Sequence, residues 1–247
     1  MNLLRALNHG LIPSHYLQKN YRRSLRGYVQ DYLKEEVFYE GLTRNVPAFS
    51  RFFEAMGYSH GSLINYTNIA RECGVTSKTV KEYFQILVDT LLGSFVLPFK
   101  KRQERQVISK APKFYLFDPG VAGAIIKRTI EEEKGELFGN AFEHFIYLEM
   151  LAHSSYHEID YSINFWRTKS GQEVDFVLGG GEVAVKVKGS AIVDKRSLRS
   201  MKTFIELYKP RQAIVVCNEK EERLHGGIRV LPWRLFLQQL WRDKIIW

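Results

Sequence analysis

The sequence predicts an α/β protein, α+β overall, in which a helical N-terminal domain precedes a mixed β-sheet flanked by helices. Three observations lead to this fold class. Residues 62–92 have the spacing of two helices joined by a tight turn. Residues 171–188 alternate between apolar and polar side chains around three glycines, which is the pattern of a β-hairpin. The segments after residue 135 follow the order helix, strands, helix, strand, strand, helix, which is typical of an α/β layer structure.

Composition favours a folded protein with anionic partners. The chain has 247 residues, of which 45% are hydrophobic and 26% charged, and its formal net charge is +9. A basic surface favours partners such as nucleic acid, although many basic proteins bind none. The N-terminus has no apolar signal segment, and no run of eighteen apolar residues occurs, so we expect a cytoplasmic protein with no membrane partner. Cys73 and Cys217 lie in no CxxC motif and no cysteine–histidine cluster, so we expect no zinc site.

The first 60 residues show helical periodicity of uneven quality. Residues 1–25 carry short, interrupted helical signals and end in a basic stretch, 21–26. A helical period follows over residues 25–39. Another runs over residues 47–56, and Gly57 is expected to end it.

The clearest motif of the N-terminal half is a helix-turn-helix. Thr67 can cap a short helix over residues 68–73, Gly74 begins a tight turn, and Thr76 can cap a second helix from Ser77 to about Leu92. The exposed start of this second helix offers residue types that contact phosphates and base edges in a major groove, namely Ser77, Lys78, Lys81 and Gln85.

Two apolar strands around a basic tip follow, as in the wing of a winged helix. The strands are residues 95–99 and 113–117, and the cations of the tip include Lys100, Lys101, Arg102 and Arg105. We therefore expect a winged helix over residues 26–134. Its partner is either double-stranded DNA or another protein, because winged helices serve both purposes and a Lys-rich tip is often only a solvated loop.

The C-terminal half begins with an amphipathic helix over residues 135–152 that contains Glu143. A strand is expected over 159–167, and the hairpin follows it. In the hairpin, Asp175 and Lys188 can lie on one face of the sheet. Such a pair is half of a metal-dependent site for cleaving phosphodiesters, or Asp175 forms an ordinary cross-strand ion pair with Lys186 or Lys188. A helix over 197–208, strands over 212–217 and 227–231, and a last helix opened by Pro232 complete the domain.

A helix glutamate followed by such a hairpin resembles the PD-(D/E)XK nuclease superfamily. The resemblance assigns Glu143 as the helix glutamate, Asp175 as the first hairpin acid and Lys188 as the lysine. It implies that Glu143 and Asp175 hold Mg²⁺, which activates water. The second acid of the motif is replaced by Lys186, which removes a ligand and puts a cation where the metal belongs. We therefore expect a nuclease-derived fold without a functional metal site, and no cofactor unless the site is active.

Taken together, the two halves resemble the C-terminal region of a prokaryotic AAA-type ATPase family. The similarity covers roughly residues 20–247, through the winged helix and the motifs at 113–121, 139–143, 165–176 and 185–188. In that family a P-loop ATPase module comes first, and a domain of unknown function joins a winged helix to a restriction-nuclease-like fold. The G-x-x-x-x-G-K-[ST] motif is absent, so this chain should not hydrolyse ATP. We expect residues 1–25 to be a remnant or linker of such a module, with the nuclease-like domain over 135–247.

Three functions follow as hypotheses. The first is a non-catalytic DNA-binding or regulatory module with a degenerate nuclease-like domain. The second is an Mg²⁺-dependent DNA endonuclease that uses Glu143, Asp175 and Lys188. The third is a protein-docking module for an ATPase partner. His153 and His157 can share a helix face, but the sequence shows no third ligand beside them, so we expect structural histidines there.

Overall fold

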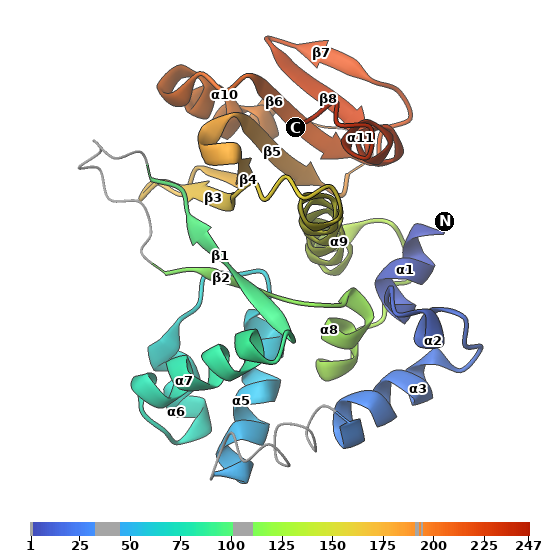
Figure 1. Ribbon diagram of the computed structural model, residues 1–247, viewed down its shortest axis with the longest axis vertical. Coiled ribbons are helices and arrows are strands. Elements are labelled where there is room, and N and C mark those ends of the chain that lie inside the picture. The colour runs from blue at the N-terminus through green and yellow to red at the C-terminus, as the bar shows by residue number, and fades with distance from the viewer. Residues whose placement is uncertain (1, 33–44, 101–110, 191–192, 194) are drawn as a thin grey trace. The chain divides into compact units, whose positions relative to one another are not determined.

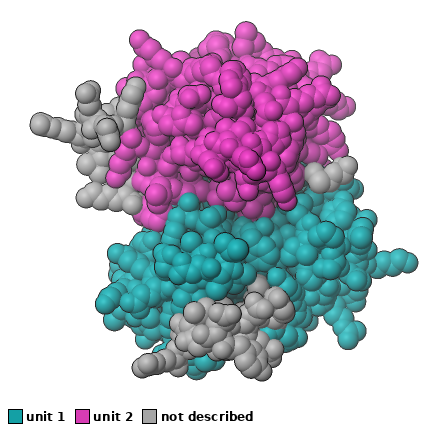
Figure 2. Space-filling view, viewed as in Figure 1, with its two compact units in different colours: residues 1–95, 113–132 teal, residues 96–112, 133–247 magenta. Residues whose placement is uncertain are grey.

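The computed structural model describes residues 2–32, 45–100, 111–190, 193 and 195–247. The chain divides into two units, which Figure 2 shows in different colours. Unit 1 comprises residues 1–95 and 113–132, and unit 2 comprises residues 96–112 and 133–247. The division falls within strand β1, Gly93–Pro98, whose first residues belong to unit 1 and whose last residues belong to unit 2.

Unit 1 is helical (Figure 1). Apart from the start of β1, its described elements are α1 (Leu3–His9), α2 (Pro13–Tyr16), α3 (Tyr21–Gly27), the π-helical turn η1 (Tyr28–Tyr32), α5 (Val46–Ser59), α6 (Tyr66–Cys73), α7 (Ser77–Asp89), β2 (Lys113–Leu116) and α8 (Pro119–Ile125). The helix expected over 25–39 is thus replaced by α3 and η1 as far as residue 32, and the rest of it lies outside the described residues. Helix α5 continues past Gly57 to Ser59.

Helices α6 and α7 form the predicted helix-turn-helix, with one difference at its start. The cap of α6 is Asn65, whose side chain accepts a hydrogen bond from the backbone of Asn68, and not Thr67. Gly74 adopts the left-handed conformation at the end of α6, where a Cβ would be strained. Thr76 caps α7 as expected by accepting from the Thr79 amide, and α7 ends at Asp89, three residues earlier than predicted.

An aromatic cluster forms the core of unit 1. Phe84 of α7 makes edge-to-face contacts with Phe52 of α5 and Phe114 of β2, with ring centroids 4.9 and 5.0 Å apart. All three side chains are fully buried. The periodic apolar positions of α5 and α7 therefore pack the helix-turn-helix against the rest of the unit.

A buried carboxylate joins the N-terminal helix to α8. Asp118 caps α8 by accepting from the Val121 amide at 2.9 Å, and its other oxygen accepts from the Leu11 amide at 2.6 Å. Glycines allow this approach, because a Cβ at Gly120 would lie only 2.6 Å from the Cα of Gly10. Residues near both ends of unit 1 are therefore held together by hydrogen bonds to one side chain.

Two further polar side chains strengthen this connection between α1 and the end of unit 1. The Asn8 amide donates to the Ile130 carbonyl and accepts from the Ile130 amide, both at 2.9 Å. The Arg128 guanidinium donates to the carbonyls of Leu7 and Pro119. Burial lowers the pKa of Arg128 to about 10, which still leaves it charged at neutral pH.

Unit 2 is built on a mixed sheet. Its strands are the end of β1, β3 (Ile163–Arg167), β4 (Glu173–Leu178), β5 (Val183–Lys188), β6 (Gln212–Cys217), β7 (Arg223–His225) and β8 (Ile228–Pro232). They are hydrogen-bonded in the order β1-β3-β4-β5-β6-β8-β7. The other neighbour of β1 in the sheet is β2. The pairs β1–β3, β5–β6 and β6–β8 are parallel, and the others of unit 2 are antiparallel. The fold class predicted from the sequence, a mixed α/β structure, is confirmed.

Helices α9 (Gly135–Tyr156), α10 (Lys195–Tyr208) and α11 (Trp233–Leu240) flank this sheet (Figure 1). Met201 and Phe204 of α10 share a buried cluster with Val177 and Ala184 of the hairpin. On the opposite face, Tyr147 of α9 stacks on Phe176, with ring centroids 5.8 Å apart. The two long helices thus cover the two faces of β4 and β5. Among the described helices, none combines the length and the apolar character that crossing a bilayer requires.

Two helical glycines provide a matched test of the α1–α8 contact. Gly120→Ala should lower the free energy of unfolding by about 1–3 kcal/mol, because the added Cβ meets backbone atoms that cannot rotate away. Gly139→Ala in α9 should raise it by about 0.5–1 kcal/mol, because that Cβ meets open space. Urea unfolding followed by circular dichroism measures both, and equal effects of the two substitutions would contradict the packing described.

Candidate functional site

The hairpin forms as predicted, with a bulge at the candidate acid. Gly179–Gly181 make the turn between β4 and β5. In the pairing of β3 with β4, Asn164 lies opposite Val177 and Trp166 lies opposite Val174. One residue of β3 and two residues of β4 lie between these pairs. Asp175 and Phe176 together thus oppose one residue of β3, which defines a β-bulge. A bulge changes the direction of a side chain, and here it directs the Asp175 carboxylate between two strands.

The Asp175 carboxylate lies between β4 and β5. One oxygen accepts from the Val187 amide at 2.6 Å, and the other lies 3.4 Å from Lys186 Nζ. Lys186 Nζ also donates to the Glu173 carbonyl at 2.9 Å. Asp175 and Lys186 are only 5% and 7% exposed. The pair is therefore a buried ion pair in which each charged group has a second hydrogen-bond partner.

This contact determines what the carboxylate can do chemically. A carboxylate that holds Mg²⁺ must direct an oxygen at the ion, and Mg²⁺ carries two positive charges that repel a nearby ammonium group. Here one oxygen of Asp175 faces a backbone amide and the other faces an ammonium. The arrangement is suited to holding β4 and β5 together.

The other two candidates of the nuclease-like set lie on different faces of the hairpin. In β5, Lys188 is in register with Cys217 of β6, and Cys217 packs in the cluster beneath α10. Alternate residues of a strand share a face, so Lys188 points to the α10 side. Glu143 is half-buried on α9, the helix that covers the opposite face. The register of β4 and β5 places Lys186 opposite Asp175, and Lys186 is one of the two lysines that the sequence offered as its ion-pair partner.

The predicted DNA-contacting residues of α7 lie at or near the surface of unit 1. Lys78, Lys81 and Gln85 are exposed, and Ser77 is half-exposed. Each of the three exposed side chains has an intramolecular contact. Lys78 lies 4.0 Å from Glu82, Lys81 Nζ is 5.3 Å from the centre of the Tyr66 ring, and Gln85 donates to Asp89 at 2.8 Å. Such solvent-exposed contacts are weak enough to exchange for phosphate contacts.

The charge of this helix pair is balanced. Residues 66–89 contain three basic side chains, Arg71, Lys78 and Lys81, and three acidic ones, Glu72, Glu82 and Asp89. The excess positive charge of unit 1 lies elsewhere. The exposed cations Lys19, Arg22, Arg23 and Arg26 lie on or next to α3.

Some of these cations surround a cavity within unit 1. Its volume is about 100 Å³, and its lining includes Arg22, Arg26, Lys127 and Arg128. Of the tip residues predicted to contact DNA, Lys100 is exposed and belongs to unit 2. Lys101, Arg102 and Arg105 lie outside the described residues.

One cluster of potential ligands was not predicted. Asp243, which follows α11, lies beside His153 and His157 at the end of α9. The four-residue spacing of the histidines was visible in the sequence, but the third ligand is 86 residues away from the nearer histidine and no local pattern connects them.

Comparison with known families assigns both halves of the chain to domains without an established function. Residues 2–132 match the family described as domain of unknown function DUF8612, and residues 138–236 match that described as DUF4143. Two uncharacterized proteins, from Mycobacterium bovis and Mycobacterium tuberculosis, are each 25% identical over 237 residues. The match covers 92% of this chain and 51% of each relative, so the chain spans about half the length of the curated relatives it matches. No solved structure matches it.

Replacement of the buried cation tests the hairpin. Lys186→Met should lower the free energy of unfolding by about 3 kcal/mol, because it leaves the Asp175 carboxylate buried opposite an apolar group. The double variant Asp175→Asn/Lys186→Met should lose less than the sum of the single variants, with a coupling of about 1–3 kcal/mol. Lys188→Met is the control, since this half-exposed side chain should cost less than about 0.5 kcal/mol. Additive losses in a urea-unfolding cycle would show that the two groups do not interact.

Proposed function

We propose that this chain, a member of the family described as domain of unknown function DUF8612 through its residues 2–132, is a non-catalytic module that binds duplex DNA. In this proposal unit 1 supplies the DNA contact through α6 and α7, and unit 2 is a nuclease-derived scaffold. An AAA-type ATPase is the proposed protein partner, which is supported by the resemblance of the sequence motifs to the C-terminal region of that ATPase family.

The observation that carries the DNA contact is the form of the helix-turn-helix. A three-residue turn from Gly74 to Thr76 joins two capped helices, and the start of α7 faces solvent with Lys78 and Lys81. The first amides of a helix and nearby lysines are the groups that position a recognition helix on phosphates. Because residues 66–89 have no net charge, base contacts or further cations must add to the affinity, and the exposed arginines of α3 are suited to bind additional phosphates.

The ion pair of Asp175 and Lys186 supports the non-catalytic part of the proposal. A metal-dependent nuclease needs carboxylates free to bind the ion, and the best-placed carboxylate is neutralised by a lysine of its own hairpin. The proposal therefore needs no metal at Asp175.

Charge reversal on α7 tests the DNA contact. Lys78→Glu/Lys81→Glu should weaken binding to a mixed-sequence duplex by at least about 10-fold at about 50 mM salt, because two phosphate contacts are lost. It should also reduce the slope of log affinity against log salt by about 2. Fluorescence anisotropy across a salt series measures both quantities.

The control for this experiment is Lys202→Glu/Lys220→Glu, which makes the same change of net charge with exposed lysines of unit 2. This variant should keep the affinity and the slope. If the wild-type protein does not bind duplex DNA even at low salt, the DNA contact is refuted and a protein-docking role takes its place. If Arg22→Glu/Arg26→Glu abolishes binding while the α7 variant retains it, the helix-turn-helix is not the contact.

The non-catalytic assignment has its own test. The wild-type protein should leave supercoiled plasmid intact in the presence of Mg²⁺ or Mn²⁺, because Lys186 occupies the position of a metal ligand. Agarose electrophoresis of the plasmid measures this. Metal-dependent nicking that disappears in a folded Asp175→Asn variant, and persists in the Lys202→Glu/Lys220→Glu control, would identify the chain as an endonuclease.

A further inference from the structure

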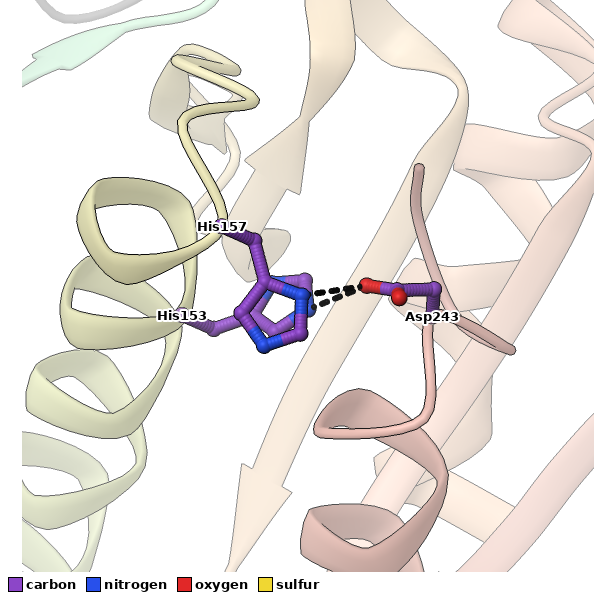
Figure 3. A group of neighbouring side chains, drawn as sticks. All are labelled: His153, His157 and Asp243. Carbon is purple, nitrogen blue, oxygen red and sulfur yellow. Dashed lines mark hydrogen bonds and ion pairs between the residues drawn. The ribbon is translucent and has the colours of Figure 1, made fainter.

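The end of α9 and the segment after α11 bring three potential metal ligands together in unit 2. Figure 3 shows the carboxylate of Asp243 directed at the rings of His153 and His157. Asp243 Oδ1 lies 3.0 Å from His153 Nε2 and 2.8 Å from His157 Nδ1. All three ligand atoms lie within 4.8 Å of one another, and no other group of at least three histidine, cysteine or acidic residues comes this close in the part of the chain that the structure describes. We propose that His153, His157 and Asp243 bind a divalent transition-metal ion of the zinc class.

The hydrogen bonds of Tyr161 indicate which nitrogen of His153 is available. The Tyr161 hydroxyl donates its single proton to the Met150 carbonyl at 2.7 Å. Its oxygen also lies 3.2 Å from His153 Nδ1, so the proton of that second contact comes from the imidazole. The neutral form of His153 therefore carries its proton on Nδ1 and directs the lone pair of Nε2 at Asp243.

This lone pair needs a positive charge opposite it. A neutral Nε2 and a carboxylate oxygen 3.0 Å apart are both acceptors, so only a proton or a cation between them makes the contact favourable. His153 is fully buried, and a second proton on a buried ring is costly. A metal ion that binds Nε2, the second histidine and the carboxylate satisfies all three groups together.

The surroundings of the cluster hold the ligands in place. Tyr161 fixes the His153 ring through the nitrogen that does not face Asp243, which is the usual outer contact of a metal-bound histidine. The Trp241 ring packs against both imidazoles, with centroids 5.7 and 5.6 Å away, and its Nε1 donates to Glu149 at 2.8 Å. Two ligands therefore come from the C-terminal end of α9, and their rings are held on one side by an anchored indole.

The donor set selects the class of ion. Two imidazoles and one carboxylate suit Zn²⁺ and neighbouring transition metals, whereas Mg²⁺ and Ca²⁺ prefer sites made only of oxygen. With metal–ligand bonds of about 2.0–2.1 Å, ligand atoms of a tetrahedral site lie about 3.3 Å apart, so the two contacts of Asp243 with the histidines need to lengthen by only a few tenths of an ångström. The side chains of His157 and Asp243 are 28% and 46% exposed, which leaves the ion a route from solvent and a fourth position for water.

Metal titration of the chain of residues 1–247 tests this proposal. After treatment with a chelator, the wild-type protein should take up one equivalent of Zn²⁺ in competition with a chromophoric chelator near neutral pH. Co²⁺ in its place should show the visible absorption of a tetrahedral ion. His157→Gln and Asp243→Asn, which alter partly exposed ligands, should each weaken binding by more than about 100-fold.

Two further variants separate a built site from adventitious binding. Tyr161→Phe should weaken Zn²⁺ binding by about 10–100-fold, because the His153 ring loses its outer hydrogen bond. His225→Gln on β7, outside the cluster, should leave binding unchanged. One equivalent retained by Asp243→Asn would overturn the proposal. Failure of the wild-type protein to bind Zn²⁺ would also overturn it and would show that a proton joins His153 to Asp243.

Discussion

The hydrogen bond from the Val187 amide to Asp175 is the constraint on which the hairpin of unit 2 depends. Regular pairing of β4 and β5 extends from Leu178 and Val183 at the turn to Phe176 and Val185. Beyond that pair, the Val187 amide donates to the Asp175 carboxylate instead of to a backbone carbonyl of β4. A charge in this position must be compensated, because the site is almost inaccessible to water. Lys186 supplies the compensating charge from the adjacent strand.

This arrangement stabilises the hairpin without a bound ion, which is what the proposed non-catalytic role requires. If an acid occupied the position of Lys186, two carboxylates would lie near each other and would need a cation between them. With lysine there, the cation is part of the chain, and the hairpin is stabilised without a bound ion. Lys186 thus supplies from within the chain the positive charge that two carboxylates would need from an ion.

Local patterns predicted the elements better than the contacts between them. The hairpin and the helix-turn-helix follow from alternation, glycine and capping residues within a few positions, so both could be recognised in the sequence. The cap at Asn65 was missed because Thr67, two residues later, is an equally suitable residue type. The short strand β7 was missed because three residues carry almost no periodicity.

The details of the sites depend on tertiary structure. Which lysine faces Asp175 is decided by the register of β4 and β5, in which Phe176 pairs with Val185, so that Asp175 comes opposite Lys186. The neighbours of His153 and His157 depend on where the segment after α11 returns to α9. Asp243 has a positive backbone φ of 55°, which no local sequence pattern predicts. Charge and spacing therefore identified candidate residues but not their partners.

The hydrogen bonds between α1 and α8 also bear on the order of events as the chain is made. Asp118 binds an amide 107 residues earlier, and Asn8 binds residue 130, 122 positions later. Contacts of such long range form late and slow the folding of a domain. During synthesis, Leu3 and Leu7 of the first helix, which are buried in the finished structure, must wait until residue 130 has left the ribosome. For that interval the nascent chain carries α1 without the α8 contacts that it makes in the finished structure.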